Sequence, residues 1–272
     1  MRTTILLASK LIACAVLWLS ASGLGAYPMV WETNRFDTDL GNWTLQLNNF
    51  ANGNDVDWRN SSTAGGTAGE LGGRFADAVQ VAYVARPLDF TIDINHEMRF
   101  RGIITITNTE QFSVGSGQDL NIWIGYFNTT SPDANRMGWR TLTPSSTAPT
   151  APFRGRPRIN AGANASAAVN MTQGVSYAFE AWWQPNGDNN TGTFSGFIGS
   201  TSWNIANYAA GASTFDAFGI FWSESSATPG LNYYVYFDNL EYLVPIPEPA
   251  VTGLALLGAL GLGARSLLRR RV

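Results

Sequence analysis

Few side chains in this chain could carry out nucleophilic or acid–base catalysis. His96 is the single histidine of the 272 residues, so a Ser-His-Asp or Cys-His site would have to use it. The single cysteine, Cys14, lies in an apolar N-terminal stretch, and no Gly-x-Ser-x-Gly motif is present. Zinc sites favour clustered histidines and cysteines, which are also missing. His96 lies in the polar segment 94–97, which we expect at the end of a strand.

Carboxylates are the remaining candidates for catalysis. A glycosidase places two of them on either side of the bond that it hydrolyses. Four glutamates of the central chain are available for such a pair: Glu32, Glu180, Glu224 and Glu241. None of them lies in a closely spaced acidic motif. The sequence therefore predicts that the protein is not an enzyme, and a glycan-active enzyme stays open as an alternative.

Oxygen ligands for a cation gather in two short segments. Calcium binds about six to eight oxygens from carboxylates, amides and carbonyls. Most of these ligands lie in two loops, Asn52, Asn54, Asp55 and Asp57 in the first and the segment 188–190 in the second. The spacing does not match an EF-hand, and Asn and Asp also form turns for local reasons. A calcium site and ordinary turns both remain open at these loops.

Aromatic side chains offer a second kind of binding surface. The C–H face of a sugar packs on an indole face, which also suits a half-exposed position. Four tryptophans lie near turns or on the strand face opposite the apolar residues, and we predict them as possible glycan-binding residues: Trp58, Trp139, Trp182 and Trp203. The alternative is that they fill the core of a broad β-protein.

The elements that must position these residues are strands. Apolar and aromatic residues alternate with polar ones at period two, and turn residues separate the alternating runs. The clearest strands are Met98–Asn108, Gln118–Asn128, Ser176–Gln184, Phe215–Ser223 and Asn232–Val244. About ten strands at this spacing predict an all-β, two-sheet antiparallel sandwich. Residues 141–157, rich in Pro, Ser, Thr and Ala, predict a long loop.

Both ends of the chain predict export. Arg2 and Lys10 flank a short lead, the segment 11–19 is apolar, and small residues follow to Ala26. This pattern is typical of a secretory signal peptide, and we place it at residues 1–26. Residues 11–14 also resemble a lipoprotein box, in which Cys14 would be acylated. Most of the apolar core follows that cysteine instead of preceding it, which favours the plain signal peptide.

The central segment 27–244 is acidic. Of the 17 basic residues of the chain, two lie in the signal segment and four in the C-terminal tail, leaving 11, all arginine. Of the 20 acidic residues only Glu248 lies outside, leaving 19 and a net charge of −8. This charge argues against nucleic acid or an anionic membrane surface as partner. Arg154, Arg156 and Arg158 form a local basic patch that could meet an acidic polysaccharide or simply lie in a solvated loop.

Residues 245–272 have three parts in a fixed order. Prolines make the first part stiff and extended, the segment 250–264 carries no charge, and arginines follow. A membrane-spanning helix needs about 20 apolar residues, with a lower limit of about 17. The run reaches that length if Arg265 snorkels. We therefore predict a C-terminal transmembrane helix with its arginines on the cytoplasmic side.

This tail resembles the PEP-CTERM sorting signal. The residues that carry the resemblance are Pro247, Glu248 and Pro249, then the apolar helix, then Arg269, Arg270 and Arg271. The resemblance implies an exported protein that is held in the inner membrane, and an exosortase that processes it near the Pro-Glu-Pro motif. An ordinary C-terminal anchor is the alternative, although such an anchor has no need of that motif.

The central segment is similar to carbohydrate-binding jelly rolls and concanavalin-like sandwiches. Residues 36–43 look like their opening strand, and residues 236–240 look like their closing strand. In such modules a structural calcium often joins these strands, which would recruit Asp37 and Asp238. The sequence thus predicts an exported, non-enzymatic structural or adhesive protein of the cell surface or extracellular matrix. A lectin-like glycan-binding module is the alternative, with extracellular polysaccharide as its partner.

Overall fold

The computed structural model describes residues 29–46, 55–66, 68–75, 82–109, 120–132, 134–142, 153–160, 168–187, 189–224 and 233–245. The predicted signal peptide and the whole sorting motif, Pro247 to Pro249 and Arg269 to Arg271, lie outside these residues. Within them there is no helix of the length and apolarity needed to cross a membrane. Residues Val30–Val244 form one compact unit.

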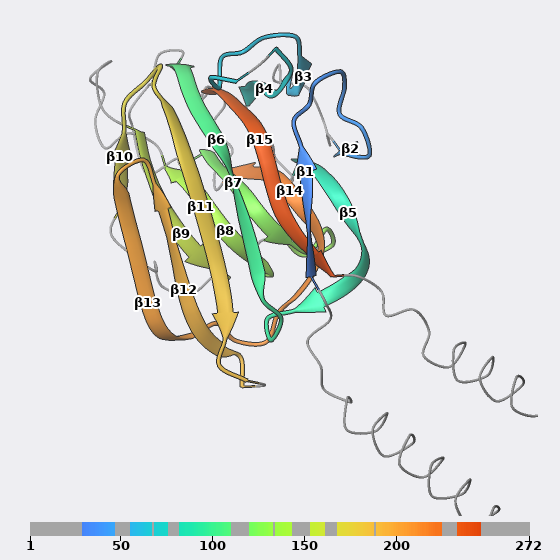
Figure 1. Cartoon of the computed structure of the whole chain (residues 1–272), viewed down its shortest axis with the longest axis vertical. Coiled ribbons are helices and arrows are strands. Elements are labelled where there is room, and N and C mark those ends of the chain that lie inside the picture. Colours follow the sequence, from blue (N-terminus) through green and yellow to red (C-terminus); the bar gives the residue numbers. More distant parts are fainter. Residues whose placement is uncertain are drawn as a thin grey trace, which may run out of the picture. The chain divides into compact units, whose positions relative to one another are not determined.

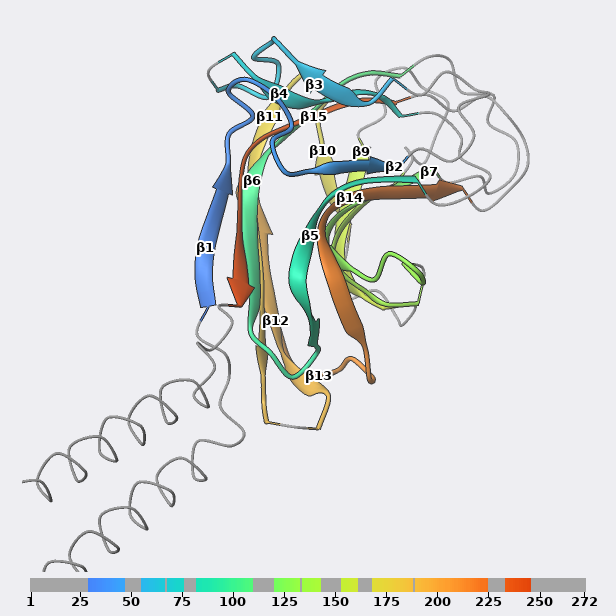
Figure 2. The ribbon, with the colours of Figure 1, turned by 90° about the vertical axis from the view of Figure 1, so that its right-hand side faces the viewer.

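Two antiparallel sheets make up this unit, as Figures 1 and 2 show. Sheet A contains, in spatial order, β13 (Thr201–Ala209), β12 (Thr191–Ile198), β11 (Ser176–Pro185), β6 (Met98–Thr109), β15 (Tyr233–Pro245), β4 (Glu70–Phe75) and β3 (Asp57–Arg59), and β1 (Met29–Asn34) pairs with β15. Sheet B contains β10 (Val169–Met171), β9 (Phe153–Ile159), β8 (Arg136–Leu142), β7 (Leu120–Phe127), β14 (Thr214–Glu224), β5 (Ala82–Asp93) and β2 (Thr44–Gln46). The predicted all-β, two-sheet sandwich is confirmed.

The strands that the sequence predicts most clearly are present with nearly the predicted ends. They are β6, β7, β11, β14 and β15, and β11 pairs with β12 across a turn that contains Asn186 and Gly187. The predicted loop at 141–157 is wrong at both ends, because β8 continues to Leu142 and β9 begins at Phe153. In β9 the inward positions are Gly155, Pro157 and Ile159, so its period-two pattern lacks the large apolar residues that mark a strand.

Aromatic rings fill the centre of the core between the two sheets. Phe218 of β14 stacks on Tyr242 of β15, with ring centroids 4.1 Å apart and planes at 16°. Phe100 of β6 packs against the same phenylalanine at 5.6 Å. The buried hydroxyl of Tyr126 in β7 lies 2.9 Å from the carbonyl of Arg99 and 2.7 Å from that of Leu243. Burial raises the pKa of Tyr126, so its hydroxyl stays protonated as a donor from sheet B to sheet A.

A row of three glycines crosses sheet B. Gly219 of β14 pairs with Gly125 of β7, which pairs with Gly138 of β8. A Cβ atom on Gly125, whose φ is 153°, would lie 2.2 Å from the carbonyl oxygen of Met137. Figure 2 shows β5 and β14 bending with the inside of the curve turned away from sheet A. The outer face of sheet B is therefore concave at these two strands.

The buried tyrosine provides the first test of this core. Tyr126→Phe removes the single hydroxyl hydrogen that the two carbonyls of sheet A share, so we expect the free energy of unfolding to fall by about 1–3 kcal/mol. Tyr177→Phe is the matched control, since its hydroxyl accepts an exposed hydrogen bond from the amide of Thr172. Urea unfolding of the two variants measures the difference. Equal loss in both variants would contradict the bridging role of Tyr126.

Candidate functional site

Five arginines lie together on the outer face of sheet B. In β9, half-buried Arg154, Arg156 and Arg158 alternate with buried residues that face the core. A Cβ atom on Gly155 would lie 2.0 Å from the indole of Trp139, which belongs to the core, so Gly155 faces the core. The arginines of β9 therefore point away from sheet A.

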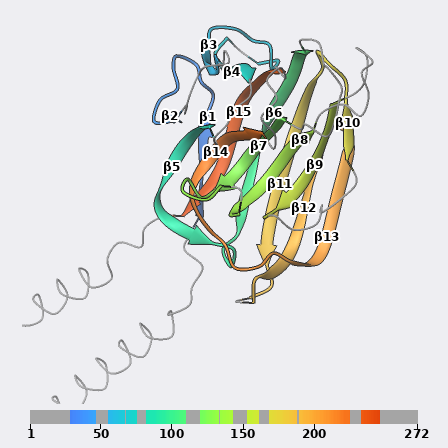
Figure 3. The ribbon, with the colours of Figure 1, turned by 180° about the vertical axis from the view of Figure 1, so that it is seen from behind.

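Strand β8 adds two arginines to the same face. Met137 and Trp139 point into the core, so Arg136 and Arg140 point outward with the arginines of β9. The register sets Arg140 directly opposite Arg156. Figure 3 shows β7, β8 and β9 side by side in this sheet. Five of the 11 arginines in residues 27–244 thus share one face of two neighbouring strands.

Aromatic residues continue this array across the sheet. Trp123 of β7 pairs with Arg140, Phe221 of β14 pairs with Trp123, and Tyr83 of β5 pairs with Phe221. Trp123 and Phe221 are stacked, with centroids 5.6 Å apart and planes at 7°. These residues, with Phe127, Ala85 and Ala217, form a hydrophobic cluster separate from the main core. We call the arginines and this cluster together the arginine–aromatic face.

Trp123 is the residue on which the arginines converge. The guanidinium carbon of Arg136 lies 4.1 Å from the centre of its ring, and those of Arg140 and Arg158 lie at 5.7 and 6.0 Å. A guanidinium near an indole face is attracted by the ring quadrupole by about 0.5–2 kcal/mol. The indole therefore helps to hold arginines from two strands in place.

The glycine row allows side chains to lie across the middle of this face. Phe127, on one side of the row, reaches Phe221 at 4.8 Å and Tyr83 at 5.6 Å on the other side. Phe127 and Trp123 are almost fully buried. Burial and the carboxylate of Asp216 raise the pKa of Tyr83 at the edge of the face, so its hydroxyl stays neutral. The aromatic rings and Arg136, which is 8% exposed, thus form a buried support layer, and the half-buried Arg140, Arg154, Arg156 and Arg158 are the polar part of the surface.

One polar atom in this layer lacks a partner. The indole N–H of Trp123 is buried and has no hydrogen-bond acceptor in the described part of the protein. The same holds for Trp139, Trp203 and Trp222, but these lie in the core between the sheets, whereas Trp123 belongs to the outer face. A buried donor without an acceptor costs about 1–3 kcal/mol, so an acceptor at Trp123 would be favourable.

The four predicted glycan-binding tryptophans do not form one surface. Trp139 and Trp203 stack on each other at 5.4 Å in the core, at most 9% exposed, where they present no face to a ligand. Trp58 is partly buried and donates a 2.6 Å hydrogen bond to the carbonyl of Phe36. Trp182 lies on the outer face of sheet A beneath Arg99, at 5.5 Å. Both indoles are buried because their side chains point into the core between the sheets, Trp139 from β8 of sheet B and Trp203 from β13 of sheet A.

The two residues predicted for calcium do lie near each other. Asp238 is 1% exposed, and burial raises the pKa of its carboxyl, as do the nearby carboxylates of Glu70 and Asp37. Its Oδ1 accepts a 2.6 Å hydrogen bond from the amide of Asn239. Among the described residues, however, no group of three or more acidic, histidine or cysteine side chains is arranged to hold a metal ion.

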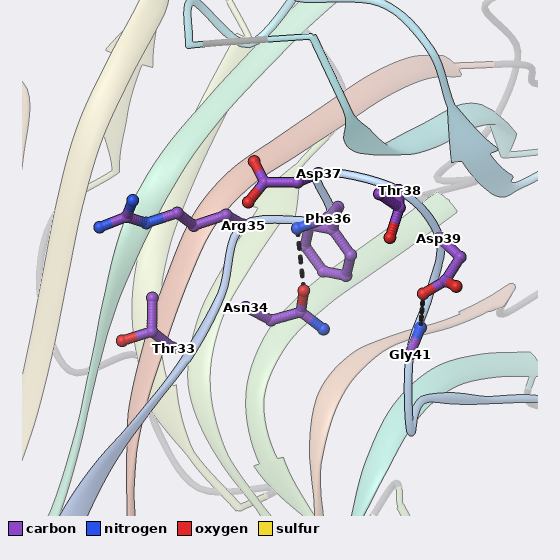
Figure 4. A pocket seen from close by; sticks show the side chains of 8 residues that line it. All are labelled: Thr33, Asn34, Arg35, Phe36, Asp37, Thr38, Asp39 and Gly41. Carbon is purple, nitrogen blue, oxygen red and sulfur yellow. Dashed lines mark hydrogen bonds between the residues drawn. The ribbon is translucent and has the colours of Figure 1, made fainter.

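An open pocket of about 420 Å³ lies beside Asp37, in the loop that follows β1 (Figure 4). Two of its other polar side chains form turns, because Asp39 accepts a hydrogen bond from the amide of Gly41 and Asn34 accepts one from that of Phe36. In the other predicted calcium loop, Asp55 pairs with Arg59 at 3.1 Å. Calcium at either place stays a prediction.

Three of the four glutamates considered for catalysis have described side chains, and each makes a contact within the protein. Glu180 bonds Arg99 at 2.5 Å and Glu241 bonds Arg101 at 2.7 Å, both on sheet A. Glu32 accepts a 2.8 Å hydrogen bond from the hydroxyl of Tyr242. The side chain of Glu224 is not described. His96 lies 2.7 Å from Asp93 in the turn between β5 and β6. Glu180 and Glu241 flank β6 from its two neighbouring strands, both opposite Arg101 in the register, and each is bonded to an arginine of that strand.

Sequence reasoning did not identify Arg136, Arg140 or Trp123 as parts of a site. A usable signal exists for the two arginines, because each lies next to an inward apolar residue, Met137 or Trp139, in an alternating run. Their proximity to β9 depends on the pairing of β8 with β9 and could not be read from the spacing.

Comparisons with known proteins give fold similarity only. No protein-family model and no curated protein matches the sequence. Similar solved structures include the catalytic domain of a GH131 β-glucanase from Podospora anserina, with 10% identity, a TM-score of 0.45, and coverage of 79% of this chain and 85% of that chain. Peanut lectin with a nine-residue peptide has 12% identity, a TM-score of 0.44, and coverage of 80% and 100%. Basic winged bean lectin with Tn-antigen has 10% identity, a TM-score of 0.45, and coverage of 81% and 100%. Similarity at this level identifies no binding residue and no reaction.

A substitution at the buried carboxyl of Asp238 tests whether this side chain binds calcium or only supports the fold. Without calcium, Asp238→Asn should raise the melting temperature at pH 7 by a few degrees, because it removes a buried charge near Glu70 and Asp37. Since the folded pKa is raised, the protonated carboxyl stabilises the fold below its usual pKa of about 4, and this contribution is lost as the pH rises through the folded pKa.

Thermal melts of wild type and variant between pH 4 and 7, with and without calcium, measure both effects. If calcium binds at Asp37 and Asp238, it should raise the melting temperature of the wild type and not that of the variant. No response of the wild type to calcium would contradict the predicted calcium site.

Proposed function

We propose that this protein is an exported, non-enzymatic structural or adhesive protein of the cell surface or extracellular matrix, and that its sandwich binds extracellular polysaccharide. The observation that carries the proposal is the arginine–aromatic face, where five arginines and a supporting aromatic cluster lie on the concave side of sheet B. A concave sheet face with convergent polar groups suits an extended chain, which can contact several strands at once.

The preference for binding over catalysis is supported by the pairing of the carboxylates. Glu180 and Glu241 lie on sheet A, and each bonds an arginine of that same sheet. The arginine–aromatic face is on sheet B. A hydrolase of glycans would require two carboxylates across the ligand. A glycan-active enzyme stays the second candidate, and loss of polymer length during incubation with the protein would establish it.

The sorting part of the proposal is supported by the tail alone. We propose that residues 245–272 anchor the exported protein in the inner membrane through a helix, with Arg269, Arg270 and Arg271 in the cytoplasm. The Pro247–Pro249 motif would then lie at the outer face, where an exosortase could process it. A plain anchor predicts the same topology without processing.

Polysaccharide binding is tested on an array of extracellular polysaccharides. The full-length protein, solubilised in detergent, should bind at least one polymer, and Arg154→Gln with Arg156→Gln should weaken that binding at least tenfold, because two charge-assisted contacts are lost. Arg101→Gln is the matched control, since it removes a half-exposed arginine of sheet A. An equal effect of the control, or binding to no polymer, would contradict the assignment of this face.

Sorting is tested in the native host by the mass and fractionation of the protein, with and without the exosortase. Replacing Glu248 and its flanking prolines by alanine should leave the anchor intact and block processing. Replacing the three terminal arginines by neutral residues should weaken retention, because the cytoplasmic charge sets the orientation of a marginal helix. Persistence of the full-length tail in both strains would support the plain anchor instead.

A further inference from the structure

We infer that this protein pairs with a second copy of itself through β13, an edge strand of sheet A, so that the two A sheets join into one. The inference goes beyond the proposed function and does not depend on it. Its first support is the position of β13, which pairs with β12 on one side and with no described strand on the other (Figures 1 and 3). The backbone N–H and C=O groups along such an edge are a template for another strand.

The second support is that the other edges of the two described sheets are short or protected. The strands β2, β3 and β10 have three residues each. Charged residues and prolines lie along the longer edges, at Glu32 of β1, at Arg86, Pro87 and Asp89 of β5, and at Arg156, Pro157 and Arg158 of β9. Proteins use these features to keep edge strands from pairing. The nine residues of β13 include neither a charge nor a proline.

The third support is the distribution of charge, which favours a second copy as the partner. Residues 189–215, which include all of β12 and β13, contain no charged side chain. The rest of the segment 27–244 holds all of its 19 acidic and 11 basic residues, with a net charge of −8. Two copies therefore repel each other over most of their surface and least at this edge. An identical strand also brings no charge of its own against β13.

The fourth support is that the side-chain pattern of β13 matches itself. Trp203 points into the core, where it stacks on Trp139 at 5.4 Å, and Ile205 is partly buried against the same core. Ser202 and Asn204 are exposed. Residues that lie opposite each other in an antiparallel pair share one face. With Asn204 opposite Asn204 of the second copy, Trp203 lies opposite Ile205 of that copy, so the apolar inner faces of both copies are continuous.

The same strand limits the assembly to two copies. The register of β12 with β13 shifts between Gly192 and Phe194, and Asn207 on β13 has a φ of 54°. This bulge ends the regular edge, so residues 201–205 are the part that can pair. A two-fold pair uses the same strand of both copies and leaves no β13 edge open. We therefore expect a small, reversible interface and a closed dimer.

A cysteine at the proposed two-fold axis tests the pairing directly. Residues 27–244 contain no cysteine, so Asn204→Cys is made in full-length protein that also carries Cys14→Ala and is solubilised in detergent. Opposite residues of an antiparallel pair have Cα atoms about 4.5–5.5 Å apart, within the range of about 4.4–6.8 Å that a disulfide requires. Mild oxidation should therefore link most of the chains into covalent dimers.

Thr91→Cys is the matched control for this cross-link. Thr91 is also exposed, but it lies in β5, whose edge carries charges and a proline. Its thiols meet only by random collision, so linking should be at least about tenfold slower than at Asn204→Cys. If Ser202→Cys chains link to Asn204→Cys chains instead, the strand pairing stands with its axis at Trp203. Equal rates at Thr91 and at both positions of β13 would overturn the pairing.

A charge at the same position tests the pairing without a covalent bond. Asn204→Glu places two carboxylates opposite each other, so the dissociation constant of the dimer should rise about tenfold or more. Thr91→Glu adds the same charge away from β13 and should leave that constant within about twofold, since distant exposed charges are screened. Sedimentation of the full-length protein in detergent over a range of concentrations measures both constants. Melting temperatures show that each variant is folded.

The remaining outcomes separate this inference from the proposed function. A wild type that stays monomeric at every concentration would overturn the inference. So would a dimer that persists in Asn204→Glu and does not link through β13, because another surface, such as the C-terminal tail, would then hold it. A series of higher oligomers would contradict the closed pair. Polysaccharide binding on the array is measured independently, and monomeric Asn204→Glu should retain it.

Discussion

The stacking of Phe218 on Tyr242 is the contact on which the rest of this sandwich depends. The two rings, 4.1 Å apart, join β14 of sheet B to β15 of sheet A, and both strands lie in the interior of their sheets. Phe218 and Phe221 lie on opposite faces of β14, the first in the main core and the second in the outer cluster. Changes to the core at this strand would therefore also move the support layer beneath the arginines.

Much of the fold was predictable because alternation reports directly on burial. The strands β6, β11 and β15 have large apolar residues at most inward positions, with Gly102 in β6 and Ala181 in β11 as small ones, and their predicted ends differ from the observed ends by about one residue. The strand β9 was missed because its inward residues are Gly155, Pro157 and Ile159. Gly155 is small because the indole of Trp139 occupies its place in the core. The residue that weakens the strand pattern is thus required by a tryptophan from the neighbouring strand.

The candidate site was less predictable, because it depends on pairing between strands. Parity could place Arg156 on one face of β9, but only the register with β8 brings it opposite Arg140. The same limit applies to the tryptophans, since Trp123 and Trp139 lie on opposite sides of sheet B although each belongs to an alternating strand. The proximity of Asp37 and Asp238 was expected from resemblance, and the structure places them near enough to raise the pKa of Asp238.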